Sequence, residues 1–373
     1  MAEDLPLLPP SIPLETPAVL KKAARAHRFL AELKGRCRAI PNQGILISTL
    51  ALQEAKDSSE IENIVTTQDE LFREDLEASP ATGLAAKEVR NYAQALRTGF
   101  ELVRNRGILT ANDLVNAQEE LEHNRAGFRR QPGTNLVNDR TGEVVYTPPQ
   151  DYDTIALLMA NFERFINDDS LLDADPLVKM AVIHYQFESI HPFYDGNGWT
   201  GRILNVLYLV LKGLLDIPVL YLSRHFIRSK EQYYQGLRVI RDEGAWESWL
   251  LYVLDAVETT SRGTLTLVDD ISTAIEDYRL RIKEGHRFYG QELVDNLFFH
   301  PYTKIEFVER DLGVSRLTAT KYLDAPRRLR LRAEGEGGSV QLLHQYPSGG
   351  DPHGASLGVS PRSPSHSARP WMG

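Results

Sequence analysis

Apolar residues recur at intervals of three and four along much of the chain, which predicts a mainly helical protein. Residues 154–167 show this pattern clearly. The apolar positions on one side of that segment are Ile155, Leu158, Met159, Phe162 and Ile166. Asp153 precedes them as a candidate N-cap. We therefore expect an amphipathic helix that packs on one face.

A second helix is predicted shortly downstream. Asp175 and Pro176 open it, because proline at the first helical position loses no hydrogen bond. The helix must end near Ile190, since His191 precedes Pro192 and a residue before proline avoids the right-handed α region.

Residues 138–149 follow a different pattern. Thr141 and Gly142 form a turn signal, Val144–Tyr146 are strong strand formers, and two prolines close the segment. We expect a short, exposed β-hairpin here.

Near the C-terminus, residues 303–325 predict two short helices around a turn at Gly313. Their apolar positions are Ile305, Val308, Leu312, Leu317 and Tyr322. From Pro326 onward the chain is rich in proline, glycine and serine and has little periodicity. Such a segment buries too little apolar surface to offset its ordering entropy, so we expect residues 326–373 to be largely disordered. A reading-frame change in the gene would explain so abrupt a shift.

Composition and charge narrow the function classes. The chain has 373 residues, of which 42% are hydrophobic and 25% charged, as in ordinary globular proteins. A net charge of -9 argues against a broad nucleic-acid-binding face. The N-terminus is acidic and proline-rich, unlike a secretory signal, and Lys212, Asp216 and Pro218 interrupt the longest apolar stretch. With Cys37 as the single cysteine, a cytoplasmic protein without a membrane span is expected.

The candidate chemistry lies in residues 191–202, HPFYDGNGWTGR. Glycines 196 and 198 bracket Asn197 just before a helical segment, and the free N–H groups of a helix N-terminus bind phosphate. Arg202 adds a charged donor to the same site. Asp195 offers a hard carboxylate oxygen of the kind that magnesium takes together with waters and substrate phosphates.

His191 stands at the start of the same stretch. Its imidazole can take a proton from an attacking hydroxyl near neutral pH. Base, metal ligand, phosphate site and arginine together indicate transfer of a phosphorus-containing group from a nucleotide. The alternative is a purely structural joint between two helices, in which the histidine caps and the glycines turn.

These twelve residues resemble the motif of Fic-domain proteins, HPFx(D/E)GNGRxxR, at every position except Trp199, where the motif has arginine. The preceding HYQFESI, the hairpin ending in YTPP and the later Tyr233-Tyr234 pair are also similar, so the resemblance extends over about residues 1–325. It implies a Fic-fold helical bundle with a β-hairpin flap, followed by a small helix-turn-helix unit similar to an incomplete winged helix.

The resemblance also implies an activity. Fic enzymes usually transfer AMP from ATP to a hydroxyl side chain of a protein, themselves included, and release pyrophosphate. His191 would then be the base, and Asp195 would hold Mg²⁺. The implied nucleotide-binding residues are Ser59, Glu62, Gly196, Asn197, Gly198, Trp199, Thr200, Gly201, Arg202 and Tyr233. The implied flap, which would hold the target chain in extended form, comprises Thr141, Gly142, Glu143 and Val144.

Residues 58–63, SSEIEN, fit the inhibitory motif (S/T)xxxE(G/N) of Fic proteins that restrain themselves. The resemblance implies that Glu62 pairs with Arg202 and obstructs the γ-phosphate. A carboxylate competes well for a guanidinium that would otherwise receive phosphate. On its own, the pattern would describe an ordinary glutamate on a helix surface.

Trp199 departs from the motif and bears on activity. An indole provides one neutral donor in place of a charged fork. We therefore expect an impaired enzyme, although the indole could instead re-tune which group is transferred. The competing class is a catalytically disabled regulator that binds nucleotide or DNA. Retained His191 and Asp195 favour catalysis, and Trp199 favours the regulator.

The expected organisation is an N-terminal region over 1–105, a catalytic core over 106–260, a linker and helix-turn-helix over 261–325, and the tail. Arg316 and Lys321 in the second short helix are a thin basic complement for DNA, so target docking or homodimer contact is the stronger expectation. His184 and Glu188 lie one helical turn apart but have no third ligand at a suitable spacing, so we expect them to pack rather than bind metal.

Overall fold

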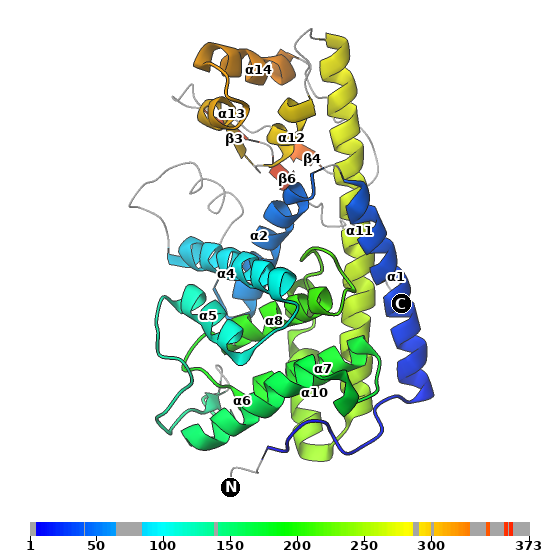
Figure 1. Cartoon of the computed structure of the whole chain (residues 1–373), viewed down its shortest axis with the longest axis vertical. Coiled ribbons are helices and arrows are strands. Elements are labelled where there is room, and N and C mark those ends of the chain that lie inside the picture. Colours follow the sequence, from blue (N-terminus) through cyan, green and yellow to red (C-terminus); the bar gives the residue numbers. More distant parts are fainter. Residues whose placement is uncertain are drawn as a thin grey trace, which may run out of the picture. The chain divides into compact units, whose positions relative to one another are not determined.

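The computed structural model shows a mainly helical chain, which confirms the predicted fold class (Figure 1). The chain divides into two compact units, residues 1–39 with 50–265 and residues 40–49 with 266–373. The expected boundary at 105/106 lies inside the first unit. The structure describes residues 5–40, 42–64, 84–137, 141–285, 291–299 and 302–328, and three short strands beyond them.

The first unit holds the helices that surround the candidate site. Its elements are α1 (Pro17–Ala39), α2 (Gly44–Ile61), α4 (Leu84–Arg106), α5 (Ala111–Glu122), β1 (Leu136–Val137), β2 (Val144–Tyr146), α6 (Tyr152–Asn167), the 3₁₀ helix η1 (Asp169–Leu171), α7 (Pro176–Ile190), α8 (Asn197–Leu211), α9 (Ser223–Arg228), α10 (Lys230–Glu243) and α11 (Trp246–Gly285). The first turns of α2 and the last turns of α11 belong to the second unit.

Two consecutive helices, α7 and α8, form the centre of this unit. Nearly every residue of both is buried. Helix α7 packs against α1, α6 and α8, while α8 packs against α4, α5 and α7. A helix that is apolar on all sides is stable only when other helices surround it. The connection between them, residues 191–196, is therefore anchored at both ends by buried helices.

The start of α6 corrects one prediction. The N-cap is Asp151, whose carboxylate accepts a hydrogen bond from the Thr154 N–H at 2.8 Å. Asp153 instead lies in the first turn, where its charge interacts favourably with the helix dipole. Because aspartate suits both positions, the sequence alone did not distinguish them.

Both predicted ends of α7 are confirmed. Pro176 is its first residue, and the Asp175 carboxylate accepts from the Leu177 N–H at 2.8 Å. The helix ends at Ile190, and His191 follows as the C-cap in a left-handed conformation with φ 49° and ψ 59°.

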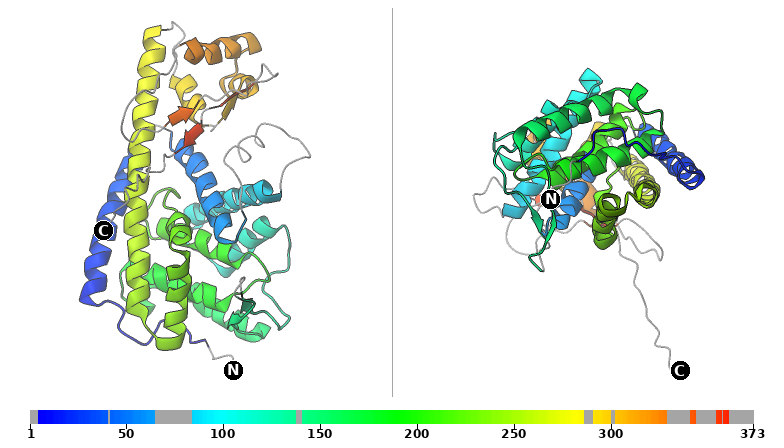
Figure 2. Two further views of the ribbon diagram at one scale, coloured as in Figure 1. Left: turned by 180° about the vertical axis from the view of Figure 1, so that it is seen from behind. Right: turned by 90° about the horizontal axis from the view of Figure 1, so that it is seen from below.

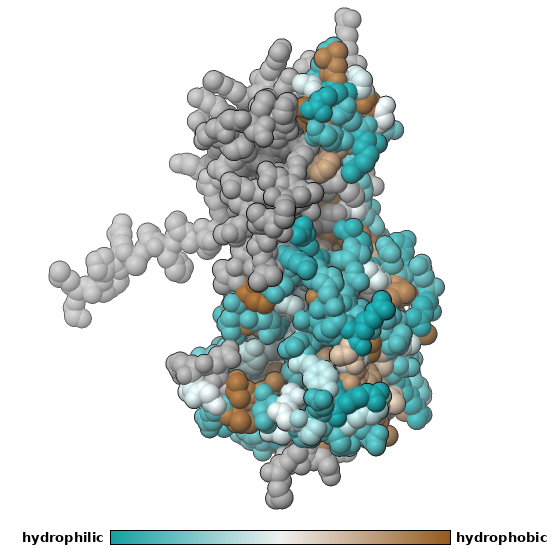
Figure 3. Space-filling model, turned by 90° about the vertical axis from the view of Figure 1, so that its left-hand side faces the viewer, coloured by the Kyte–Doolittle hydropathy of each residue, from teal (hydrophilic) through white to brown (hydrophobic). Residues whose placement is uncertain are grey.

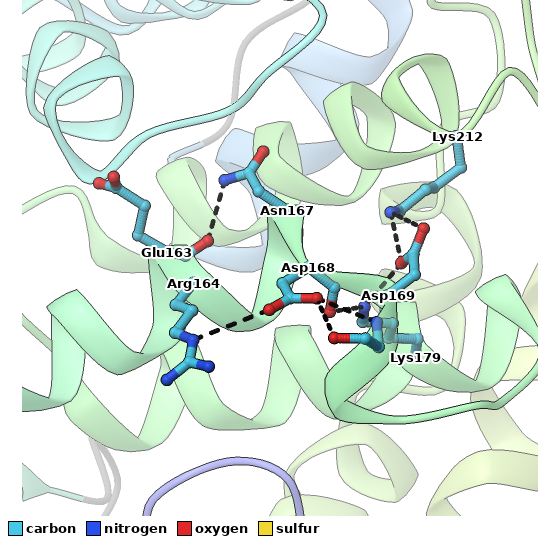
Figure 4. Close-up of polar contacts among 8 residues, drawn as sticks. Glu163, Arg164, Asn167, Asp168, Asp169, Lys179 and Lys212 are labelled. Atoms are coloured by element: carbon cyan, nitrogen blue, oxygen red, sulfur yellow. Dashed lines mark hydrogen bonds and ion pairs between the residues drawn. The ribbon is translucent and has the colours of Figure 1, made fainter.

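Polar contacts tie down the ends of α7 and α8 that lie away from this connection (Figure 4). The buried Lys179 donates to Asp169 at 2.8 Å and to the Asp168 carbonyl at 3.2 Å. Lys212, just after α8, donates to the same Asp169 carboxylate at 2.6 and 2.8 Å. Asp169 thus links α7 and α8 through η1.

Helix α1 runs beside the first part of α11, as the views in Figures 1 and 2 agree. Lys22 pairs with Asp255 at 2.5 Å and with Glu258 at 2.8 Å. Arg25 also pairs with Glu258, at 2.7 Å. The N-terminal helix is therefore part of the same compact unit as the centre.

The second unit contains α12 (Gln291–Phe299), β3 (Tyr302–Lys304), α13 (Ile305–Leu312) and α14 (Arg316–Arg328). Gly313, with φ +61°, lies in the turn between α13 and α14, as predicted. Val308, Ala319 and Leu323 are buried, whereas Leu317 is 70% exposed, so its assignment to the apolar face was wrong. Leu317 lies two residues before Ala319, which places it on the opposite side of the helix.

Part of the predicted disordered tail has regular structure. Helix α14 continues through Pro326 to Arg328. Strands β4 (Gln341–Leu343), β5 (Gly354–Ser356) and β6 (Gly358–Ser360) follow, and β3 pairs with β5 and β4 with β6, all antiparallel. The expectation that residues 326–373 are largely disordered stays a prediction. The other residues of 326–373 lie outside the described part of the chain.

The face in Figure 3 is mainly hydrophilic, and the hydrophobic residues on it form small separate groups. Among the described residues, no helix is both long and apolar enough to cross a membrane.

Candidate functional site

The glycine-rich stretch forms the N-terminus of α8. Gly196 is its N-cap with φ +78°, a conformation that glycine adopts without strain. The helix begins at Asn197, so the first N–H groups, those of residues 197–199, have no partner within the helix. The free N–H groups that the sequence predicted at this helix N-terminus are thus present, and such groups can bind phosphate.

Two predicted phosphate-site side chains are engaged within the loop itself. The Asn197 amide accepts from the Phe193 N–H at 2.9 Å and donates to the Phe193 carbonyl at 2.8 Å. The Thr200 hydroxyl donates to the Gly196 carbonyl at 2.8 Å. These bonds hold the loop closed, so both residues serve the site through backbone geometry.

The remaining two glycines are close to other groups. A methyl group on Gly198 would collide with the Glu62 carboxylate and lie 3.0 Å from the Arg202 guanidinium. One on Gly201 would lie 2.5 Å from a Glu188 carboxylate oxygen. Gly198 therefore borders the Arg202 site, while Gly201 allows α8 to pack against α7.

His191 lies partly buried at the C-terminus of α7. Desolvation, followed by the nearby Arg129 guanidinium, lowers its pKa to about 4, against the smaller opposing effects of Glu62 and the Glu188 carbonyl. The imidazole is therefore neutral at physiological pH, the form that a general base requires.

Asp195 lies exposed one residue before the N-cap of α8. Its carbonyl accepts from the buried Gln118 amide at 3.3 Å, which restrains the backbone. One carboxylate beside a phosphate-binding helix N-terminus fits Mg²⁺, which keeps waters and phosphate oxygens as its other ligands. Among the described residues no group of three or more His, Cys, Asp or Glu side chains could hold a metal ion.

Arg202 is buried and joined to the end of α2. It donates to the Glu62 carboxylate at 2.8 Å, to the Ser58 hydroxyl at 2.7 Å and to the Ser58 carbonyl at 3.2 Å. Burial acts to lower the pKa of Arg202, but the combined effects of Glu62, Tyr233 and Tyr92 outweigh it, so that pKa is raised. The Glu62 side chain is 38% exposed. The contact predicted between the SSEIEN segment and the second arginine of the motif is thus present.

Two further glutamates surround Arg202, and burial raises both pKa values. That of Glu54 rises to about 8, although Ser223 and Tyr92 donate hydrogen bonds to it. That of Glu188 rises to about 7, against the opposing effect of Arg202. Of these three glutamates, Glu62 is the one to which Arg202 donates a hydrogen bond within the described part of the chain.

Lys230 holds the C-terminal end of α2 from the first residue of α10. Its ammonium donates to the Ile61 carbonyl at 2.6 Å and to the Asn63 side chain at 3.1 Å. The last carbonyls of a helix have no partner within it, and a cation there is favourable. Lys230 therefore contacts the residues on both sides of Glu62, through the backbone carbonyl of Ile61 and the side chain of Asn63.

Trp199 occupies the third position of α8 and is only 5% exposed. Its indole N–H is buried without a hydrogen-bond partner within the described part of the chain. The motif's first arginine is thus replaced by a buried neutral ring, which removes one charged donor from the phosphate side of the helix.

Two other predicted nucleotide contacts lie in the core. Tyr233 is buried, with its hydroxyl 2.9 Å from His184 and its ring stacked on Phe226. Ser59 is buried, and among the described residues its hydroxyl has no hydrogen-bond partner. Tyr234, by contrast, is exposed.

The predicted flap is a two-stranded antiparallel hairpin in which Val137 pairs with Val144. Thr141, Gly142 and Glu143 lie in the turn, and the Glu143 N–H donates to the Thr141 hydroxyl at 3.3 Å. The flap residues 141–144 are all exposed. The predicted turn residues 138–140 lie outside the described part of the chain.

Sequence reasoning missed the residues that fix the site from outside the motif, namely Arg129, Gln118 and Lys230. All three donate to backbone carbonyls, which belong to the α7–α8 connection, to Pro149 after β2 or to the end of α2. Every residue has a backbone carbonyl, so the residue types in the sequence do not show which carbonyl accepts a hydrogen bond, and no side-chain pattern pointed to these pairs.

Comparison with known families gives three matches along the chain. The Fic/DOC family N-terminal domain matches residues 20–101, and the Fic/DOC family domain matches residues 108–209. The C-terminal domain of the SoFic-like protein adenylyltransferases matches residues 275–332.

Curated relatives carry the same kind of name. A probable protein adenylyltransferase of Aquifex aeolicus is 28% identical over 232 residues, covering 61% of this chain and 64% of the relative. The protein adenylyltransferase Fic of Culex quinquefasciatus is 30% identical over 196 residues, covering 50% and 38%. The chain thus spans less than two thirds of the length of either.

Solved structures share the fold. A Fic family protein from Desulfovibrio desulfuricans matches with a TM-score of 0.57 at 20% identity, over 95% of this chain and 100% of that one. Fic-1 from C. elegans matches with a TM-score of 0.52 at 20% identity, over 68% and 74%.

Proposed function

Because this chain belongs to the Fic/DOC family, we propose that it is an autoinhibited protein adenylyltransferase, which transfers AMP from ATP to a Ser, Thr or Tyr hydroxyl of a protein, itself included. The observation that carries the proposal is the placement of two groups around the connection between α7 and α8. A neutral His191 lies at the start of this connection, and Arg202, which donates a hydrogen bond to Glu62, lies one turn into α8.

The reaction needs little beyond these groups. The target hydroxyl attacks the α-phosphorus of ATP and passes its proton to the His191 imidazole. The bond from the α-phosphorus to the bridging oxygen breaks, and pyrophosphate leaves with that electron pair. The N–H groups of residues 197–199 stabilise the negative charge on the phosphate oxygens. The exposed flap residues would hold the target segment by backbone pairing, which requires little of its sequence.

Asp195 would hold a magnesium ion together with the phosphates of ATP. Bound there, the ion neutralises phosphate charge and supports the departure of pyrophosphate. The Gln118 amide, which is bonded to the Asp195 carbonyl, keeps this carboxylate at the helix N-terminus.

Restraint would come from competition for one guanidinium. Arg202 can bind the terminal phosphates of ATP only if it gives up Glu62, and a methyl group at Gly198 would already collide with Glu62. Because the Glu62 side chain is 38% exposed, it can leave for solvent without a large rearrangement of the core.

The test is Glu62→Gly, which we expect to raise self-modification from labelled ATP by about 10–100-fold, the equivalent of one charge-assisted hydrogen bond of about 1.5–3 kcal/mol. Label is measured on the purified full chain with ATP, UTP and GTP in parallel. Glu60→Gly is the matched control, because it removes a carboxylate two residues away with no bond to Arg202. Equal labelling by both variants and the unchanged chain would contradict autoinhibition through Glu62.

Lys230→Met should weaken the same restraint, by about 2–5-fold, since it removes roughly 1 kcal/mol of hydrogen bonding at the end of α2. Lys34→Met is the control, because Lys34 also donates to a carbonyl at 2.6 Å, that of Gly213, away from the site. Initial rates of self-modification are compared in otherwise unchanged chains and again with Glu62→Gly. If Lys230→Met still raises the rate once Glu62 is gone, Lys230 does not act through Glu62.

A second candidate is a catalytically disabled regulator that binds nucleotide, and the neutral, buried Trp199 favours it. DNA binding has less support, because Arg316 pairs with Glu306 at 3.0 Å and with Glu309 at 3.8 Å. Homodimer formation through the C-terminal region remains a prediction from the sequence.

A further inference from the structure

Arg129 lies in the irregular segment between α5 and β1, and its side chain is fully buried. Its guanidinium donates from Nε to the His191 carbonyl at 2.8 Å. One terminal nitrogen donates to the Ile190 carbonyl at 3.3 Å and also to the Pro149 carbonyl. All three partners are backbone carbonyls, so this buried guanidinium stabilises the backbone at Pro149, Ile190 and His191.

The three carbonyls belong to the two parts that the proposed reaction must bring together. Ile190 is the last residue of α7 and His191 is its C-cap, so their carbonyls would otherwise lack partners. Pro149 follows β2, at the base of the flap hairpin. One planar group with donors in a fixed fork therefore joins the start of the catalytic loop to the flap.

Neighbouring bonds extend this link. The Arg129 N–H donates to the Pro192 carbonyl at 2.9 Å. The Tyr194 hydroxyl accepts from the N–H groups of Arg130 and Gln131 at 2.9 and 3.1 Å. On the flap side, the Tyr146 hydroxyl donates to the Ser189 carbonyl at 2.8 Å. Residues 129–131 thus bond to the connection between α7 and α8. Strand β2 bonds, through Tyr146, to the C-terminal end of α7.

His191 needs this support because of its backbone. Its φ of 49° lies in the left-handed region, which is unfavourable for a residue with a side chain, so a bond to its carbonyl helps to hold it there. A change in this conformation would redirect the imidazole, and a shift of about 1 Å in a reacting group can cost roughly 10²-fold in rate.

We propose that Arg129 is a positioning residue that holds the backbone of His191 and the base of the flap in one fixed geometry. It does not touch the phosphate loop at residues 196–202, so it acts on presentation of the base and of the target segment, and leaves nucleotide binding to the helix N-terminus. The catalytic part of this proposal rests on the proposed function; the structural coupling does not.

The first test is hydrogen exchange on the full chain, which needs no activity. In Arg129→Met, exchange of amides in residues 141–149 and 189–194 should rise together, by about 10-fold or more, while α8 keeps its protection. Arg130→Met is the control, because the Arg130 side chain is exposed and its guanidinium lies over the Tyr152 ring at 4.2 Å, while its bond to the Tyr194 hydroxyl is made by the backbone N–H, which the substitution keeps. If only one segment loosens, or if Arg130→Met loosens both, the coupling is wrong.

The second test uses chains that also carry Glu62→Gly. Arg129→Met should lower kcat for transfer by about 10²-fold and leave the Kd of ATP within about 3-fold. Arg129→Lys keeps the charge but cannot reach three carbonyls, so it should recover only part of the rate. Equal losses in kcat and ATP affinity would mean that Arg129 supports the whole fold, which would overturn the positioning role. If the Glu62→Gly chain itself transfers nothing, the proposed function fails, and the exchange result alone decides the coupling.

Discussion

His191→Ala, introduced together with Glu62→Gly, is expected to lower AMP transfer by about 10²–10⁴-fold, the usual contribution of a positioned general base. The imidazole is the group that receives the proton of the attacking hydroxyl. Its pKa of about 4 keeps it neutral, so the difference between the two chains should persist from about pH 5 to 8. A fully solvated histidine would instead lose half of its base form near pH 6.5.

The measurement is the initial rate of label transfer from ATP, at several pH values, in the two chains. His123→Ala is the matched control. His123 is also a helix C-cap in the left-handed conformation, with φ 51°, but it is exposed and stands at the end of α5. The control therefore reproduces the backbone effect of the substitution without the chemistry. A rate that His191→Ala leaves within a few-fold of its parent would rule out His191 as the base.

Trp199→Arg is the second large effect, and here we expect a gain of about 10–100-fold in transfer or in ATP affinity. The substitution restores a charged donor at the third position of α8, and one charge-assisted hydrogen bond corresponds to about 1.5–3 kcal/mol. The present indole N–H has no hydrogen-bond partner among the described residues, so the substitution breaks no such bond there. The substitution should also lower the free energy of unfolding, because the indole ring is only 5% exposed and its apolar packing is lost.

Trp199→Phe distinguishes the effect of a charged donor at position 199 from the effect of changing the aromatic ring. It keeps an aromatic side chain and removes the N–H, so it should leave transfer within about 3-fold of the unchanged chain. Thermal unfolding of all three chains shows whether the arginine variant is folded. Transfer that appears only in Trp199→Arg would assign the natural chain to the second candidate, a disabled scaffold. A folded arginine variant with no gain in either quantity would show that position 199 does not contact the phosphates.

Local patterns anticipated much of the site. Pro176 at the first position of α7 and Pro192 after its end set the two ends of this helix, because ring geometry acts within one or two residues. The glycines around Asn197 indicated the N-terminus of α8. The pairing of Glu62 with Arg202, which are 140 residues apart, was expected only because two motifs of one family occurred in the same chain.

One expectation failed for a reason of packing. Leu317 was assigned to an apolar face, but the buried face of α14 passes through Ala319 and Leu323. A residue of the expected type therefore has its side chain on another side of its helix. The place of Tyr233 beside the nucleotide, which the resemblance implied, stays a prediction.

The sequence by itself determined the helices on either side of the loop and both ends of α7, because caps, turns and apolar periodicity depend on near neighbours. The tertiary structure alone decided three things: that His191 is desolvated and neutral, that Trp199 has no partner for its N–H among the described residues, and that Arg129 joins loop to flap. Each of the three depends on desolvation or on backbone carbonyls that are distant in the chain. Desolvation and such hydrogen bonds do not follow from a residue's identity or from its sequence neighbours. They follow from the folded chain, which decides which groups lose contact with water and which carbonyls accept a hydrogen bond.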